Sequence, residues 1–279
     1  MRILAMRSSP HDPAKSRSID FLVAKLTHHV GLERGDIDAI ERAFGRDVRL
    51  LDDRMPIVEA GEAPRAIHVL LDGWAVRELA MRDGRRQIVS ILIAGDIVDF
   101  NAFMMARADM DVRTVGQASV ASLDRASLSR LNQESPNTGQ ALWWEAMVGA
   151  SIQREWSANI AARRAEPRIA NLLCNLLARR MLVDGVEGNA IACPLTQSDL
   201  ANACGLTQEH LNRTLRGLRA RGLVELRQGM IHLPDPERLA AIAEFSSAHL
   251  HCPDRDLFFA ARPDAAPRED VSMLLASAL

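Results

Sequence analysis

The chain has 279 residues, of which 48% are hydrophobic, and a formal net charge of −2 at pH 7. This length exceeds that of a usual single domain, so we expect two domains, each with its own core. A charge this close to zero excludes a chain that is basic throughout, so any surface for nucleic acid has to be local.

The first part of the chain combines short helices with a β domain. Residues 1–18 are polar and contain prolines, so we expect a flexible start, and apolar spacing then predicts helices over Ile19–Val30 and Asp36–Phe44. From about residue 47 the apolar period changes to two. Many short strands broken by turns, among them a hairpin tip at Asp83-Gly84, predict a β-sandwich or a small barrel. The predicted strands are Val48–Leu51, Pro56–Glu59, Ile67–Leu71, Ala75–Met81, Gln87–Ile93, Ile97–Phe100, Val112–Val115 and Ser119–Leu123.

A long helix is predicted after the β domain. A short helix over Arg125–Asn132 precedes it, and the long one runs from about Thr138 to Arg164. Its first half is apolar on almost every side, so it must be buried on more than one side. We expect one face to pack on the β domain and another on the same helix of a second chain, although burial within one chain is the alternative. The predicted dimer contacts are Leu142, Trp143, Met147, Gly149, Gln153, Trp156 and Ile160.

The stretch Leu195–Leu233 predicts two short helices joined by a glycine turn and followed by a β-hairpin. Thr196 and Asp199 have the spacing of a capping box, and the first helix stops at Gly205, which tolerates the positive φ of a tight turn. Thr207 can cap the second helix. This is the pattern of a helix-turn-helix, and the short strands on either side of the turn at residues 227–229 form a wing.

The second helix has one apolar face and one polar face. Leu211, Leu215 and Leu218 fall together at helical spacing, which leaves the opposite side exposed. Arginine fits guanine edges, asparagine and glutamine fit adenine, and glutamate accepts from cytosine, so this side suits the major groove of DNA. Arginines further along fit phosphate better. The predicted DNA-binding residues are Thr207, Gln208, Glu209, Asn212, Arg213, Arg216, Arg219 and Arg227.

Two more helices complete the predicted DNA-binding domain. Pro167 is expected to bend the chain before a helix over Ile169–Leu182, and Asp235-Pro236 starts a last helix that runs to about Phe245. Residues 246–279 show no sustained pattern and are expected to form a tail. His249, His251, Cys252 and Asp254 carry possible metal donors, but no second cluster accompanies them, so we predict no metal and no cofactor.

This order of elements resembles the Crp/Fnr family of bacterial transcription regulators. The resemblance is strongest over LTQSDLANACGLTQEHLNRTLRGLRARGLV and HVLLDGWAVRELAMRDGRRQIVSILIAGDIVDF. It implies an α+β fold with an N-terminal β-roll of the cyclic nucleotide-binding type, a dimerisation helix and a C-terminal winged helix-turn-helix. The domains expected are a flexible start at 1–18, a β-roll sensor domain at 19–135, a dimerisation helix at 136–165, a DNA-binding domain at 166–245 and a tail at 246–279.

The resemblance also implies what the protein does. Members are homodimers rather than enzymes, read palindromic promoter sites (inverted repeats) in double-stranded DNA, and contact RNA polymerase. Matching the motif residue by residue implies that Glu209 and Arg213 read a core containing a G·C pair, while Gln208 and Asn212 tune the neighbouring bases. A signal at the β-roll is expected to shift a hinge around residues 164–168 and so change the separation of the two recognition helices.

The expected sensor half departs from the cyclic-AMP binders of the family. Asp99-Phe100 stands where they have Gly-Glu, and Met110-Asp111 stands near their Arg-Ser pair, while Arg113-Thr114 and Arg107 are offset. Asp109 and Asp111 would repel a phosphate. No cysteine precedes Cys174, so the cysteine cluster of the iron–sulfur branch is missing. We therefore expect regulation independent of cyclic AMP, with an unknown effector.

Two other functions remain open. A cupin-like small-molecule enzyme would need a metal or acid–base set inside the barrel, for which the strands offer His68, Asp99 and Arg113. An adaptor that keeps the fold without binding DNA would need a disabled reading face. The cysteines form no CxxC pair, and no apolar stretch suits a signal peptide or membrane span, so we expect a cytoplasmic protein without a membrane partner. Cys174 and Cys204 are expected to be small core residues.

Overall fold

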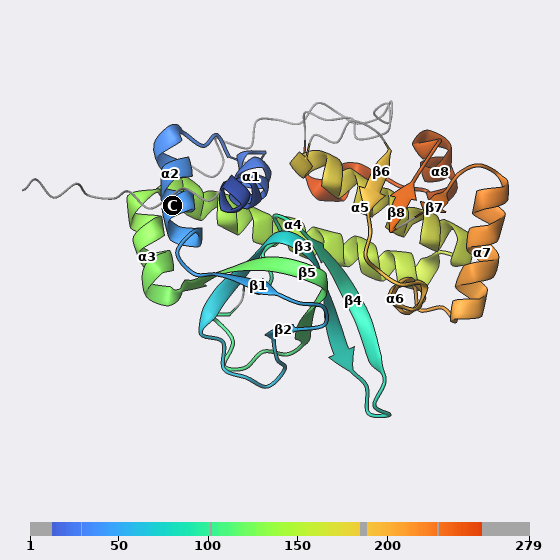
Figure 1. Cartoon of the computed structure of the whole chain (residues 1–279), viewed down its shortest axis with the longest axis horizontal. Coiled ribbons are helices and arrows are strands. Elements are labelled where there is room, and N and C mark those ends of the chain that lie inside the picture. Colours follow the sequence, from blue (N-terminus) through green and yellow to red (C-terminus); the bar gives the residue numbers. More distant parts are fainter. Residues whose placement is uncertain (1–12, 29, 101, 185–188, 228, 253–279) are drawn as a thin grey trace, which may run out of the picture.

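The computed structural model describes residues 13–28, 30–100, 102–184, 189–227 and 229–252. A β-sheet domain and a C-terminal group of helices lie side by side, and the long helix α4 (Pro136–Ala162) runs past both along the length of the molecule (Figure 1). Among these residues no helix is both long enough and apolar enough to cross a bilayer.

Two helices at the amino end close one end of the β domain. They are α1 (Pro13–Thr27) and α2 (Arg34–Phe44). The first begins at Pro13, inside the segment predicted to be flexible, and ends before the predicted Val30. Leu22 and Phe44 are fully buried and share one hydrophobic cluster with the sheet. Residues 1–12 of the predicted flexible start lie outside the described residues.

The β domain is a five-stranded antiparallel sheet with the order β1-β5-β3-β4, and β2 also pairs with β5. Ile97 forms only an isolated bridge with Val69, so the predicted strand over Ile97–Phe100 is wrong. The strands are β1 (Val48–Leu51), β2 (Pro56–Val58), β3 (Ala66–Ala80), β4 (Arg86–Ile93) and β5 (Asp111–Asp124).

Two pairs of predicted strands are in fact single long strands. The turn signal at Asp72-Gly73 lies inside β3, where the pairing with β5 shifts register on both sides of Asp72 and Gly73 has φ +87°. Gly116 similarly interrupts β5 without ending it. A β-bulge accommodates such residues within a continuous strand, so a turn signal alone does not mark a strand end.

The helices α3 (Arg125–Glu134) and α4 follow the sheet, and the Oγ of Ser135 caps α4 by accepting from the amide of Thr138. Only Arg163 and Arg164 separate α4 from α5 (Ala165–Asp184). Pro167 lies in the first turn of α5, where its missing N–H is not needed. The break therefore precedes most of the hinge predicted at residues 164–168.

The C-terminal half is a winged helix-turn-helix domain. Its sheet has three strands in the order β6-β8-β7, and the first of them was not predicted. Ser247–Leu250 forms a short 3₁₀ helix, and Leu250 is buried, so the expected tail begins with packed residues; positions 253–279 lie outside the described residues. The elements are β6 (Ala190–Ala192), α6 (Gln197–Ala203), α7 (Gln208–Ala220), β7 (Glu225–Arg227), β8 (Met230–His232), α8 (Pro236–Ala243) and η1 (Ser247–Leu250).

The two halves share a hydrophobic core, contrary to the expectation of two separate ones. Trp74, Val76 and Ile91 of the sheet belong to the same buried cluster as Leu173 and Leu176 of α5, and this cluster continues into the helix-turn-helix. Because burying apolar surface is the main favourable term in folding, this contact holds the C-terminal half against the sheet.

A buried ionic network reinforces the same junction. Lys25 of α1 lies 2.5 Å from Asp96 of the turn after β4 and also pairs with Glu145 of α4. Arg179 of α5 pairs with the second carboxylate oxygen of Asp96 and donates to the carbonyl of Ile91 at 3.0 Å. Burial raises the pKa of Asp96, but the charges of Arg179 and Lys25 outweigh it and hold that pKa below its ordinary value. Three helices and the turn after β4 are thereby joined by buried charges.

Candidate functional site

The turn between α6 and α7 has the predicted geometry. Thr196 and Asp199 form a reciprocal capping box at the start of α6, with Asp199 N donating to Thr196 Oγ1 at 3.1 Å and Thr196 N to Asp199 Oδ2 at 2.9 Å. Gly205 has φ +60°, and the amide of Leu206 donates to the carbonyl of buried Ala201 at 2.9 Å. These bonds set the two helices in the close contact that a helix-turn-helix requires.

Helix α7 separates a buried face from an exposed one, as predicted. Its N-cap is Thr207, whose hydroxyl accepts from the amide of His210 at 3.2 Å. The apolar face is fully packed, because Leu211, Leu215 and Leu218 are all buried. On the other side Gln208, Glu209, Arg213 and Arg216 are exposed and Asn212 is half-buried. In Figure 1 α7 lies at the outer edge of the molecule, away from the sheet.

The remaining predicted DNA-binding residues border this face. Arg219 is exposed in the last turn of α7. Arg227, on the wing strand β7, lies 3.5 Å from Glu225 and is mostly exposed, and the wing turn at position 228 lies outside the described residues. A helix of this kind fits the major groove, with side chains near its start at base edges and basic residues at its end near phosphate.

Arg168 has a structural role that the sequence analysis missed. Its Nη1 donates to the carbonyl of Cys204 at 2.9 Å, in the turn of the helix-turn-helix, and its Nη2 donates to the carbonyl of Arg163 at 2.7 Å. Asn159 of α4 donates to the carbonyl of Arg168 at 3.1 Å. Arg168 therefore ties the turn to the end of α4. The only sequence signal was a charged residue next to Pro167 at the start of an apolar helix.

Helix α4 presents an exposed stripe that contains two of the predicted dimer contacts, Trp143 and Met147. Trp143 and Met147 have relative exposures of 52% and 56%, and Ala150 and Arg154 continue their stripe. Leu142 has a relative exposure of only 3% and packs in the core of its own chain, which corrects its predicted role as a dimer contact. Leu142 was misassigned because the first half of α4 is apolar on nearly every side, so the spacing alone did not show which face its own chain covers.

The other predicted dimer residues are half-buried within the chain. Gln153 donates from Nε2 to the carbonyl of Val89 at 3.2 Å. Trp156 packs against the core of the C-terminal half, and Gly149 and Ile160 are partly covered. These residues lie beside the exposed stripe, so a partner helix on Trp143 and Met147 would reach them only at its border.

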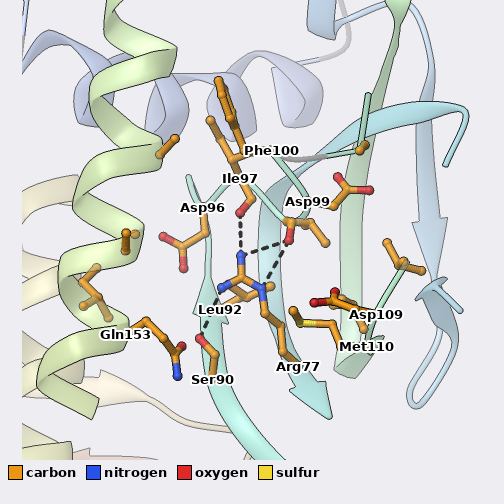
Figure 2. Close-up of a pocket in the computed structure, with 18 of the residues that line it drawn as sticks. Arg77, Ser90, Leu92, Asp96, Ile97, Asp99, Phe100, Asp109, Met110 and Gln153 are labelled. Atoms are coloured by element: carbon orange, nitrogen blue, oxygen red, sulfur yellow. Dashed lines mark hydrogen bonds between the residues drawn. The ribbon is translucent and has the colours of Figure 1, made fainter. Parts of the chain in front are cut away.

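A cavity of about 660 Å³ lies between the sheet and α4. Figure 2 shows Arg77 within it, with Ser90, Ile97 and Asp99 nearby. The guanidinium group of Arg77 donates to the carbonyls of Ile97 and Val98, at 3.1 and 2.9 Å from Nη2, and lies 3.5 Å from Ser90 Oγ. Much of the remaining wall is apolar, as in Val98, Phe100, Met104, Met110, Trp143 and Met147.

The charged groups around this cavity are bonded within the protein. Arg179, the second cation of the described lining, is held by Asp96 and the carbonyl of Ile91. The offset pair suggested by the sequence is also engaged, because Arg113 lies 4.0 Å from Glu78 and Thr114 donates to the carbonyl of Asp52 at 2.6 Å. Arg107 donates to the carbonyl of Gly61 at 2.6 Å.

Acidic side chains also lie close to these basic groups. Asp109 lines the cavity. Asp111 lies 2.5 Å from Arg86, and a hydrogen bond from the amide of Ala60 is the main reason that its pKa is lowered. Asp109 is therefore placed where it opposes a second negative charge in the cavity, whereas Asp111 is outside the described lining and is paired with Arg86.

The residues named for the cupin-like alternative form a hydrogen-bonded pair rather than a ligand set. His68 Nδ1 lies 2.8 Å from Asp99 Oδ2, and the amide of His68 donates to Asp99 Oδ1 at 2.6 Å. Arg113 pairs with Glu78 instead. In the part of the chain that the structure describes, no three His, Cys, Asp or Glu side chains form a group that could hold a metal ion.

Three of the four cysteines are buried, as expected for Cys174 and Cys204. Burial raises the pKa of both of these thiols to about 12 and that of Cys193 to about 11. A thiol with so high a pKa forms little thiolate at neutral pH, so these residues act as small apolar groups in the core.

The fold and the exposed helix define a DNA-binding protein with a β-domain on its amino side. Comparison with protein families agrees, because a Cyclic nucleotide-binding domain matches residues 49–135 and a Crp-like helix-turn-helix domain matches residues 167–242. The chain belongs to the Crp/Fnr family of transcription regulators.

Curated relatives support the same assignment, and a solved structure shares the fold. The chain is 28% identical over 161 residues to the nitrogen fixation regulation protein FixK of Bradyrhizobium diazoefficiens. This aligned segment covers 58% of this chain and 67% of that protein. The chain is 26% identical over 180 residues to the transcriptional activator FnrL of Cereibacter sphaeroides, covering 63% and 71%. The FixK2 structure from Bradyrhizobium japonicum has a similar fold, with a TM-score of 0.63 at 20% identity, over 71% of this chain and 98% of that one.

Proposed function

We propose that the protein is a homodimer that binds inverted-repeat promoter DNA through α7 and regulates transcription in the cytoplasm. The observation that carries this proposal is the exposed face of α7, on which Glu209 and Arg213 stand one helical turn apart beside Gln208. Arginine and glutamate at these places match the donors and acceptors of a G·C pair. Contact with RNA polymerase belongs to the same proposal and rests on the family resemblance alone.

The homodimer is supported by the exposed stripe of α4. Trp143 and Met147 are large apolar side chains that a monomer would leave in water, and clustered exposed apolar surface marks interaction sites. Pairing two copies of α4 along this stripe would cover both side chains. It would also place one α7 at each end of a two-fold arrangement, as an inverted repeat requires.

We also propose that cyclic AMP is not the effector. The support is chemical: Arg77 and Arg179, the cations of the described cavity wall, already bond to groups of the protein, while Asp109 opposes a phosphate. A cyclic nucleotide would have to displace these bonds to gain a phosphate partner. Titration calorimetry with cyclic AMP and the purified protein tests this directly, and measurable binding would contradict it.

Selection of binding sites from randomised duplex DNA by the purified protein tests the main proposal. We expect enrichment of an inverted repeat whose half-sites contain a G·C pair. A protein that enriches no sequence at low salt, where electrostatic contacts are strongest, would contradict DNA recognition and favour the adaptor alternative.

A further inference from the structure

The strand β4 lies at the edge of the described sheet, and side chains from three helices bond to its backbone. An edge strand leaves a row of N–H and C=O groups that need partners. Here Asn202 of α6 bonds at Arg86 and Ile88, Gln153 of α4 donates to the carbonyl of Val89, and Arg179 of α5 donates to that of Ile91. The edge of β4 is therefore the surface on which the C-terminal half is seated.

Asn202 makes the most complete of these contacts. Its Nδ2 donates to the carbonyl of Arg86 at 2.8 Å, and its Oδ1 accepts from the amide of Ile88 at 2.6 Å, so the side-chain amide pairs with β4 as a neighbouring strand would. In return Gln87 donates from Nε2 to the backbone carbonyl of Asn202 at 2.6 Å. Three hydrogen bonds thus join one residue of α6 to a span of three residues in β4.

A second contact fixes the same helix from another loop of the sheet domain. Arg54, between β1 and β2, lies 2.7 Å from Asp199 Oδ2, and the pairing holds the pKa of Asp199 below its ordinary value although burial acts in the opposite direction. Together with the hydrogen bonds of Asn202, this ion pair attaches α6 at two points, which prevents the helix from rotating about either one.

These contacts leave the DNA-facing residues uncovered. Gln208, Glu209 and Arg213 of α7 are exposed, and so are Gln197 and Ser198 at the start of α6. The sheet domain therefore holds the helix-turn-helix by a side that does not compete with DNA. An inhibitory contact would be expected to cover the reading face instead.

We propose that Asn202 is a positioning residue: its pairing with the edge of β4 sets the orientation of α7 relative to α4, and so the spacing between half-sites that the dimer accepts. This inference rests on the proposed function. Two half-sites are read together only when both recognition helices present the correct separation. The C-terminal half could turn about the two-residue break at Arg163 and Arg164. Such a turn would break the hydrogen bonds that the amide of Ile88 and the carbonyl of Arg86 make to Asn202.

The test uses the full chain, a duplex series with varied spacers between the half-sites, and a duplex with one half-site. The variants are Asn202→Ala and Gln87→Ala, and the control is Asn132→Ala, an exposed asparagine on α3. Gln87→Ala is the more informative of the two variants. Gln87 belongs to the sheet domain, whereas Asn202 lies within the helix-turn-helix itself. For Asn202→Ala and Gln87→Ala we expect about a tenfold loss on the preferred spacer, tolerance of other spacers, and unchanged affinity for one half-site.

Hydrogen exchange without DNA gives a second readout. In Asn202→Ala the amide of Ile88 loses its acceptor and should exchange faster, whereas Asn132→Ala should leave it unchanged. An unaltered spacer preference in both variants, an equal loss on single half-sites, or tighter binding by Gln87→Ala would overturn the proposal. If the wild-type protein bound no duplex, the proposed function would fail, and exchange at Ile88 would still report whether the contact exists.

Discussion

At the scale of single residues, we expect the exposed side chains of α7 to have different roles in the proposed DNA complex. Arg213 lies in the middle of the helix beside Glu209, whereas Arg219 lies in its last turn. Because base edges are reached by side chains deep in the groove and phosphates by those at its border, the two arginines should contribute to different measurements.

Arg213→Ala should weaken binding to the selected site by about 1–3 kcal/mol and relax the preference at one base pair, because a forked contact to guanine is lost. The measurement is a titration against the selected duplex and its single-base variants. An equal loss on the selected and on random DNA would show that Arg213 contacts phosphate instead.

Arg219→Ala should weaken binding to all sequences by a similar factor and reduce the slope of log affinity against log salt by about one, since one phosphate contact is lost. Titrations at several salt concentrations measure both effects. A loss confined to the selected site would contradict this assignment.

His249 makes stability depend on pH. Its ring is half-buried beside Phe245, accepts from Asn175 at Nε2 and donates from Nδ1 to the carbonyl of Ser246, so the neutral form fits. Burial lowers its pKa to about 4, against an ordinary value of 6.5. Below pH 6.5 His249 becomes protonated in the unfolded chain but stays neutral in the folded one. The free energy of unfolding should therefore fall by up to about 3 kcal/mol between pH 6.5 and 4.

Chemical denaturation across this pH range, on wild type and His249→Gln, measures the effect. The variant should lose stability less steeply on acidification, even if it is less stable at pH 7. Identical slopes for the two proteins would contradict the assignment to His249.

At the scale of secondary-structure elements, the network around Asp96 joins α1, α4 and α5 to the turn after β4. Its two acids and two bases, all buried, balance one another in charge. Removing one member leaves a buried charge without its partner, which is more damaging than the loss of an exposed ion pair.

Asp96→Asn should therefore lower the free energy of unfolding by about 3–5 kcal/mol, because Lys25 and Arg179 remain buried as cations. Urea denaturation measures this, with Asp83→Asn as the control, since Asp83 pairs with Arg85 on the exposed hairpin tip. A similar small change in both variants would show that the network contributes little.

Sequence patterns predicted elements well where the signal is local. Capping boxes, N-caps and the positive φ of Gly205 placed α6 and α7 within a residue or two, because a few neighbouring side chains determine those ends. Strand ends in the β domain were predicted less well. Asp72-Gly73 carries a turn signature, yet pairing with β5 continues through it, and pairing between distant strands is invisible to a local pattern.

At the scale of the whole molecule, the contacts between the two halves were beyond the reach of the sequence. Asn202 and Arg54 are ordinary polar residues in their own segments, and only the fold brings them to β4 and Asp199. The exposed face of α7, in contrast, was predictable because it follows from helical spacing alone. On α4, spacing did not distinguish the exposed Trp143 and Met147 from Leu142, which its own chain buries.

Met147→Glu should convert the dimer to a monomer and abolish preference for an inverted repeat, because it places a charge in the centre of the exposed stripe of α4. Sedimentation velocity on the free protein measures the change in mass. The control is Leu50→Glu, at an even more exposed apolar residue on β1 with a relative exposure of 68%. A Met147→Glu protein that stays dimeric would place the dimer contact elsewhere.

The most direct test of DNA recognition by a dimer is native mass spectrometry of the full chain bound to a duplex that carries the selected inverted repeat. The quantity measured is the mass of the complex. Recognition by a dimer predicts two chains per duplex, and one duplex with a single half-site should bind far more weakly. A complex with one chain per duplex, or equal affinity for one and two half-sites, would contradict recognition by a dimer that sets two α7 helices at a fixed separation.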